Sequence, residues 1–275
     1  MIVALPLLIA FGTRVALKPE EINLLSCEEK KYSTEILSID PLIIYINDFI
    51  FDKEIDYLMK LGKRVSVYKA FKKLFDNDQV RTVDKPYRSS SSAFLPYEDP
   101  VCQCIGKRAL DFLGFVEHKA HERLQLVRYY PGQEYNLHSD WLYNPKVSRS
   151  PGDEGQEYNR LGSFFTYIGG NSTGGETYFP FVNGASLTAD PTKYAISSNG
   201  QGLLVKPVKG SALFWMNLHP NNGTGNDKTF HSGLPVHSGV KYGMNLWTKH
   251  YKSTPILGPY ESKEDRKFEP EEAHV

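Results

Sequence analysis

The sequence lacks the features that mark nucleic-acid-binding proteins, disulfide scaffolds and zinc ribbons. Lys+Arg and Asp+Glu each number 32, so the formal net charge is zero. A chain without net positive charge has no general attraction to nucleic acid or to an anionic membrane, and we expect no nucleic-acid partner. The three cysteines are too few for a disulfide scaffold, and their odd number leaves at least one without an intrachain partner. No CxxC pair occurs, which argues against a structural zinc ribbon.

No apolar run is long enough to cross a bilayer. Residues 1–12 are apolar, but the run ends at Thr13, well short of the roughly 20 residues that a spanning helix needs. We interpret residues 1–22 as an apolar leader, either a signal peptide or a short anchor, with a buried strand as the alternative. The leader favours the endoplasmic reticulum or secretory pathway over the cytoplasm, and only such an anchor would contact a membrane. Sequons at Asn171 and Asn222 would be glycan acceptors there.

The rest of the chain is long enough to bury a full core in one domain. At 275 residues, one domain of ordinary size fits better than two. We assign residues 34–255 to this domain. Residues 256–275 are charged and poor in apolar side chains, so we expect a mobile tail.

Strand patterns outnumber helical ones along the domain. Aromatic residues make up 13% of the chain, which suits a β-rich fold. Runs rich in β-branched and aromatic residues predict strands at 35–51, 124–130, 161–168, 203–207, 212–218 and 239–248. Helices are expected at 53–61 and at 100–113, each preceded by an aspartate that can cap it. We expect a solvated turn at 88–92, a mobile loop at 142–160 and irregular structure at 181–202. Two helices packed on many short strands indicate a β-sandwich or open barrel.

A His-x-Asp pair, His138 and Asp140, follows directly on an apolar run. In extended backbone, residues two apart point to the same face, so both side chains can bind one ion. A second histidine would complete a two-His, one-carboxylate set, which leaves open positions on a metal and favours non-haem Fe(II) oxygen chemistry. His219, His231 and His237 all lie where this ligand is needed, and spacing alone does not choose among them. The remaining histidines have polar sequence neighbours and are expected at the surface: His118, His121, His250 and His274.

A lysine near the end of the domain also faces the expected interior. Strand alternation over residues 240–248 places Lys241 on the same face as Trp247. A lysine with a tryptophan on one face is unusual for a core and suits the wall of a pocket. A lysine inside a barrel needs an anion as its partner.

Four blocks of sequence, taken in order, resemble the Fe(II)/2-oxoglutarate dioxygenases and, within them, the prolyl 4-hydroxylases. The blocks are RYYPGQEYNLHSD, GGETYFP, VKPVKGSALFW and FHSGLPVHSGVKYGMNLW, and the similarity covers residues 35–251. A His-x-Asp pair alone is weak evidence, whereas four ordered blocks with matching spacing are specific. The resemblance implies a mainly β fold with flanking helices around a double-stranded β-helix (jelly-roll) core.

The resemblance also assigns roles to residues. It implies His138, Asp140 and His231 as iron ligands, because the family spacing of ten residues between histidine and lysine selects His231 before Lys241. Lys241 would bind the C5 carboxylate of 2-oxoglutarate, with hydrogen bonds from Thr177 and Tyr129. The resemblance also implies that Tyr135 and Trp247 line a groove for a peptide substrate, and it makes Arg88 a further candidate for substrate binding. On pattern alone, the tyrosines, the threonine and the tryptophan would be interpreted as core residues.

The implied reaction is hydroxylation of an unactivated C–H bond, most simply prolyl 4-hydroxylation of a peptide or protein. Its cofactors would be Fe(2+), 2-oxoglutarate and O2, with ascorbate as reductant. One alternative is a tailoring oxygenase for a free amino acid or a small peptide-derived metabolite. Another is a non-catalytic jelly-roll binding module. A zinc hydrolase shares the ligand types but has no use for Lys241.

Overall fold

The computed structural model describes residues 27, 29–75, 89–114, 120–150, 152–182, 190–197, 200–252 and 256, with backbone alone at 66–75. The expected leader, almost all of the expected tail and Arg88 lie outside the described residues. None of the helices described is both long enough and apolar enough to cross a bilayer.

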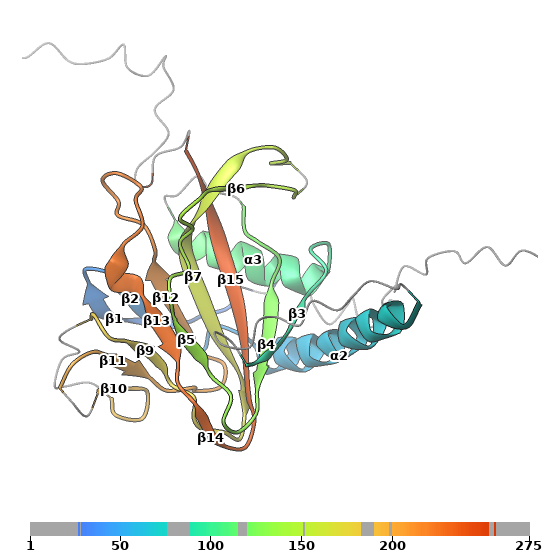
Figure 1. Ribbon diagram of the computed structural model, residues 1–275, viewed down its shortest axis with the longest axis horizontal. Coiled ribbons are helices and arrows are strands. Elements are labelled where there is room, and N and C mark those ends of the chain that lie inside the picture. Colours follow the sequence, from blue (N-terminus) through green and yellow to red (C-terminus); the bar gives the residue numbers. More distant parts are fainter. Residues whose placement is uncertain are drawn as a thin grey trace, which may run out of the picture.

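An eight-stranded antiparallel sheet runs through the middle of the molecule (Figure 1). Its strands run in the order β1-β2-β12-β7-β15-β4-β3, and β6 pairs with β7. The strand bounds are β1 Ser33–Ile39, β2 Leu42–Asn47, β3 Ser91–Phe94, β4 Gln125–Tyr129, β6 Lys146–Val147, β7 Glu157–Gly170, β12 Ala212–Met216 and β15 Lys241–Tyr251. The strands are not consecutive in the chain, as expected for a jelly roll in which the chain passes repeatedly between two sheets.

A five-stranded antiparallel sheet faces the large one, with its strands in the order β10-β11-β9-β13-β5. Its bounds are β5 Tyr135–His138, β9 Thr177–Phe179, β10 Tyr194–Ile196, β11 Leu203–Val205 and β13 His231–Gly233. Two short strands, β8 Thr173–Gly174 and β14 Val236–Ser238, pair beside it, and a 3₁₀ turn, η1 Asp227–Thr229, precedes β13. The predicted mainly β, jelly-roll fold is therefore confirmed.

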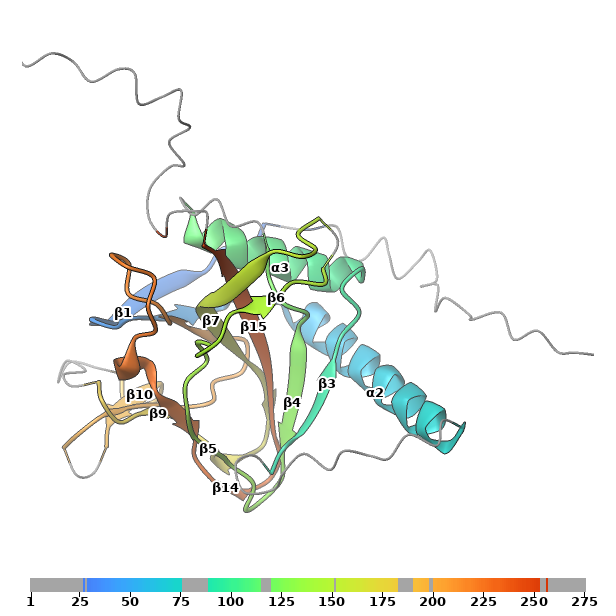
Figure 2. The same cartoon turned by 45° about the horizontal axis from the view of Figure 1, so that its top comes forward.

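Two helices lie on the other side of the large sheet, as Figure 2 shows: α2 Asp52–Phe75 and α3 Pro100–Leu113. Asp99 caps α3 by accepting hydrogen bonds from the backbone N–H of Val101 and Cys102. A disulfide joins Cys27 to Cys104 and so ties the chain before β1 to α3. Cys102 is a buried free thiol, as the odd number of cysteines requires.

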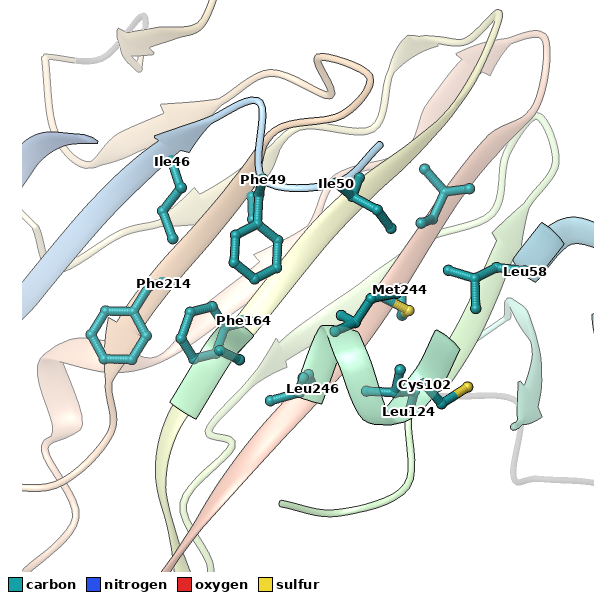
Figure 3. Close-up of a cluster of buried hydrophobic side chains, with 14 of the residues drawn as sticks. Ile46, Phe49, Ile50, Leu58, Cys102, Leu124, Phe164, Phe214, Met244 and Leu246 are labelled. Atoms are coloured by element: carbon teal, nitrogen blue, oxygen red, sulfur yellow. The ribbon is translucent and has the colours of Figure 1, made fainter. Parts of the chain in front are cut away.

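The large sheet has a separate core on each face. On the helix side, Phe164 of β7, Phe214 of β12 and Met244 of β15 pack against both helices (Figure 3). On the other side, Phe165 and Tyr167 of β7 belong to a second core shared with the five-stranded sheet. The alternation along β7 is what a strand buried on both faces requires.

The element predictions hold best where the apolar pattern is regular. All six expected strand regions contain strands, and helix 100–113 has the predicted bounds, whereas α2 runs well beyond the expected 53–61. The prediction of a solvated turn at 88–92 is wrong for Ser91 and Ser92, which belong to β3 and pair with β4. The loop prediction for 142–160 is also wrong, since β6 and the start of β7 form a hairpin there. The irregular segment 181–202 contains β10.

Candidate metal centre and the pocket around it

His138, Asp140 and His231 meet at the side of the five-stranded sheet that faces the large one. His138 ends β5 and His231 begins β13, and the two are paired directly opposite each other in the ladder. One ligand atom from each of the three residues lies within 4.8 Å of the others. Among the described ranges this is the one such group of His, Cys, Asp or Glu side chains. The sheet register therefore chooses His231, which spacing alone could not do.

Backbone carbonyls orient both imidazoles. His138 Nδ1 lies 2.8 Å from the Asn136 carbonyl, and His231 Nδ1 lies 2.9 Å from the Thr229 carbonyl. An N–H at each Nδ1 donates to these oxygens, which leaves the lone pair on Nε2. Each Nε2 then lies 3.8 Å from an oxygen of Asp140, one from Oδ1 and the other from Oδ2. Fixing the tautomer through the second ring nitrogen is how proteins prepare histidine as a metal ligand.

Asp140 is buried and held as a carboxylate. Ser163 donates to its Oδ2 at 2.6 Å, and Asn217 Nδ2 donates in turn to the Ser163 hydroxyl at 2.9 Å. Arg160 Nη1 lies 3.9 Å from Oδ1. Burial alone would raise the pKa of Asp140, but the electrostatic effects of the neighbouring imidazoles and Arg160, together with the hydrogen bond from Ser163, outweigh it and lower the pKa to about 2. An ionised, oriented carboxylate is what a divalent metal requires.

Aromatic rings pack against the histidines. The Tyr135 ring stacks on His138 with centroids 3.6 Å apart. Phe179 stacks on His231 at 5.4 Å, and Trp215 meets the same imidazole edge-on at 4.6 Å. These contacts restrict rotation of both imidazoles and exclude water from one side of the group.

The donor set fits a redox-active divalent iron. The group supplies three ligand atoms, two imidazole nitrogens and one carboxylate oxygen, so an ion that takes more than three ligands would keep positions open for others. Atoms 3.8 Å apart can both lie about 2 Å from an ion between them, the usual metal–nitrogen or metal–oxygen distance.

Lys241 is a buried ammonium that lacks an anionic partner. Its side chain is 2% exposed and donates to the carbonyl of Gly175. The rings of Phe165 and Tyr129 lie 5.0 and 5.4 Å from Nζ. Among the described residues, no carboxylate stands within ion-pairing distance. Burial lowers the pKa of Lys241 to about 8, although the charge of Glu176 opposes the shift. Two donors of this ammonium are available for a bound anion, which fits a dicarboxylate ligand.

The predicted hydrogen-bonding residues lie beside this ammonium. Tyr129 is directly opposite Lys241 in the β4–β15 register. Thr177 lines the same pocket, and its hydroxyl is 2.8 Å from the Tyr167 hydroxyl. Sequence reasoning missed Tyr167 as a partner, although strand alternation along β7 places it on the same face as Phe165.

Tyr135 and Trp247 also line the pocket that contains the three clustered residues and Lys241. The Arg160 guanidinium lies 3.8 Å over the Trp247 ring and makes a two-point ion pair with Glu122, at 2.6 and 2.9 Å. Sequence reasoning missed Arg160 because it was assigned to a polar loop. The pocket therefore has an aromatic wall on one side of the clustered residues and a buried cation on the other.

The other histidines lie apart from this group. His219 is half-buried and His237 is exposed, and neither belongs to the cluster. His121 is 4% exposed, so its assignment to the surface is wrong. A β-bridge joins His121 to Thr248, and its imidazole contacts the Tyr97 ring. The prediction failed because it rested on the polar residues next to His121 in the sequence, whereas these distant residues cover its side chain. His250 is half-buried, and His118 and His274 lie outside the described residues.

Comparisons with known proteins agree with this geometry. The family model described as "2OG-Fe(II) oxygenase superfamily" matches residues 124–249. Probable prolyl 4-hydroxylases 7 and 6 of Arabidopsis thaliana are each 31% identical, over 79% and 77% of this chain and 65% and 70% of their own lengths. The rat prolyl 4-hydroxylase subunit alpha-1 is 33% identical over 75% of this chain, which spans only 34% of that subunit.

One solved structure supports the fold. It is the viral collagen prolyl hydroxylase of Paramecium Bursaria Chlorella virus-1 in its 2OG complex. The TM-score is 0.52 and the sequence identity 24%, over 75% of this chain and 95% of the viral one.

Proposed function

Because this chain belongs to the 2OG-Fe(II) oxygenase superfamily as a prolyl 4-hydroxylase-like member, we propose that it hydroxylates proline at C4 in a peptide or protein. The proposed reaction uses Fe(2+), 2-oxoglutarate and O2, with ascorbate as reductant. One observation carries the proposal: a two-His, one-carboxylate group and an unpaired buried ammonium line the same pocket.

The proposed metal ligands are His138, Asp140 and His231. When bound, iron and 2-oxoglutarate supply the oxidation by O2 of an unactivated C–H bond, with 2-oxoglutarate converted to succinate and CO2. Ser163 holds the carboxylate of Asp140 in the orientation that meets both imidazoles. The rings packed on the histidines limit the access of bulk water, which would compete for open metal positions.

Lys241 is the proposed partner of the distal carboxylate of 2-oxoglutarate. Its burial means that an ion pair with the ligand would be little screened by solvent. Thr177 and Tyr129 are proposed to donate hydrogen bonds to the same carboxylate, a role supported by their position in the lining of the pocket that contains Lys241. The carboxylate and its three donors would then fix which end of the dicarboxylate faces the metal ligands.

The proposed substrate contacts are Tyr135 and Trp247, with Arg88 as a further candidate. Proline-rich segments are recognised elsewhere by aromatic surfaces that pack against the pyrrolidine rings. Tyr135 and Trp247 offer such surfaces in the pocket that holds the proposed metal ligands.

A substrate screen tests the proposal. Protein with Fe(II), ascorbate and 2-oxoglutarate is incubated with proline-containing peptides, free proline or small amides, and succinate and a gain of one oxygen are measured. We expect both products with the peptides, and neither with a Lys241→Ala variant. Oxygen gain on free proline alone would indicate the tailoring oxygenase, and absence of succinate under all conditions would indicate a binding module.

A further inference from the structure

A hairpin follows Asp140 in the chain, and its second strand leads back to the proposed metal centre. After Asp140 the chain passes through β6, turns, and comes back along β7 to Arg160, which lies 3.9 Å from Asp140. The turn contains Gly152 and Gly155, both at positive φ (90° and 81°), a conformation that glycine adopts without strain. We call residues 146–157 the β6–β7 hairpin. Figure 1 shows it beside the ends of β7 and β15.

A buried lysine joins this hairpin to the large sheet. Lys249 Nζ donates to Ser148 Oγ at 2.7 Å, to Ser150 Oγ at 2.9 Å and to Asp153 Oδ2 at 2.7 Å. The Tyr251 hydroxyl donates to the same carboxylate oxygen. As far as the described residues show, these are the side-chain hydrogen bonds that tie the turn of the hairpin to β15.

All three hydrogen-bond donors of the Lys249 ammonium are used by oxygens of the hairpin. Its side chain is 2% exposed, and its three ammonium donors match the three oxygens. The lysine also lies 4.9 Å from the centre of the Tyr158 ring. Because charge without a partner is costly in such a place, removing Asp153 or Lys249 would release the hairpin rather than leave it in position.

The same strand connects the hairpin to the pocket. Trp247, which lines the pocket, precedes Lys249 by two residues and shares its face of β15. Two apolar side chains are exposed where the chain enters the hairpin: Tyr143, just before it, is 76% exposed and packs on Trp141 with ring centroids 4.4 Å apart, and Val147 of β6 is 56% exposed. An extended peptide that reaches the pocket would find apolar surface there.

We propose that Lys249 and Asp153 form a positioning latch, which holds the β6–β7 hairpin next to the start of β7, where Arg160 contacts Asp140 and Trp247 of the pocket, and thereby sets the affinity for the peptide substrate. The substrate part of this inference rests on the proposed function. The latch leaves the 2-oxoglutarate site unchanged, because Lys241 lies at the opposite end of β15 from Lys249.

Three variants test the latch: Lys249→Met, Asp153→Asn and the double substitution. We expect each single change to raise the KM for the peptide by about tenfold, equivalent to about 1.4 kcal/mol, with kcat within about twofold of the wild type. The double variant should be no worse than the single ones, because both remove the same interaction. The dissociation constant of 2-oxoglutarate should not change.

Amide hydrogen exchange gives a readout that does not depend on activity. The backbone N–H groups of Ser148 and Gly155 are hydrogen-bonded within the hairpin. Both should exchange at least about tenfold faster in the variants, while the amides of β12 keep the wild-type rate. Glu54→Gln is the matched control, since it breaks a buried ion pair with Arg108, 2.8 Å long, that joins α2 to α3 and includes no residue of the hairpin. It should lower stability without changing the KM.

The outcomes separate the two proposals. Unchanged exchange in the hairpin would overturn the latch. Faster exchange with an unchanged KM would overturn its role in substrate binding. A wild-type protein without turnover on any peptide would refute the proposed function and the substrate part of the inference together, and the exchange rates would still decide the latch.

Discussion

At the scale of single residues, the environment of Lys241 decides how the pocket treats an anion. The side chain is buried against rings and one carbonyl, and its pKa is about 8, well below the ordinary value for lysine, because burial penalises the charged form. A bound carboxylate favours the charged form and so raises this pKa again. With the proposed role of Lys241, binding of 2-oxoglutarate would therefore be coupled to uptake of a proton above pH 8.

This coupling predicts the pH dependence of 2-oxoglutarate affinity. Below pH 8 the ammonium is already charged, so the affinity should be nearly constant. Above pH 8 the affinity should fall by up to about tenfold per pH unit, since one proton must be taken up with each ligand. Calorimetric titration with Mn(II) present, from pH 7 to 9, measures the affinity for 2-oxoglutarate at each pH. Lys241→Arg, which does not titrate in this range, is the control. A wild-type profile that stays flat to pH 9 would contradict the coupling between ligand binding and protonation of Lys241.

The sequence predicts some of these residues and not others. A local pattern, two ligand-type residues with one residue between them, picks out His138 and Asp140, although Asp140 lies two residues beyond the end of β5. His231 needed the family spacing, since its position opposite His138 depends on the pairing of β13 with β5. Ser163 and Arg160 also contact Asp140, but both are about twenty residues further along the chain. Only the folding of the sheets brings them to Asp140, so no local pattern predicts these contacts.

At the scale of elements, helix α3 shows how much a single capping residue supports. Asp99 is buried, and its Oδ1 accepts from the N–H groups of Val101 at 3.0 Å and Cys102 at 3.2 Å. Its Oδ2 accepts from the Tyr57 hydroxyl of α2 at 2.7 Å. One carboxylate thus caps α3 and joins it to α2, and both helices cover the same face of the large sheet.

Removing this carboxylate should destabilise the fold. Asp99→Ala loses a cap worth about 1 kcal/mol and leaves the Tyr57 hydroxyl without its acceptor, so we expect a loss of about 2–3 kcal/mol. Urea unfolding followed by fluorescence measures it. Asp99→Asn retains a capping oxygen and should lose less than half as much. An alanine variant within about 0.5 kcal/mol of the wild type would contradict the assigned role.

Elements were predictable where local signals are strong. Helix α3 has a capping aspartate, a proline at its first turn and a regular apolar stripe, so its bounds follow from the sequence. The β6–β7 hairpin was mistaken for a mobile loop because its sequence is polar. What orders it is the contact between Lys249 and Asp153, nearly a hundred residues apart, which no local pattern contains.

At the scale of the whole molecule, the pocket exists only because two sheets face each other. The five-stranded sheet supplies the two histidines, while Lys241 and Trp247 come from β15 in the eight-stranded sheet. The core between the sheets, with Tyr167, Phe179 and Trp215 among its members, holds them in this relation. Composition and strand patterns predicted a β-sandwich or barrel. The order of strands in each sheet was beyond them, because it depends on long-range pairing.

The proposed function depends above all on His138, Asp140 and His231 binding one metal ion. The most direct measurement is the binding of Mn(II), a redox-inert substitute for Fe(II), to the wild type and to Asp140→Ala, with folding of each checked by circular dichroism. We predict one ion per wild-type chain and an affinity at least about 100-fold weaker in the variant, because an ion in this group would lose its only anionic ligand. Equal affinity in the two folded proteins would place the metal elsewhere and contradict the account.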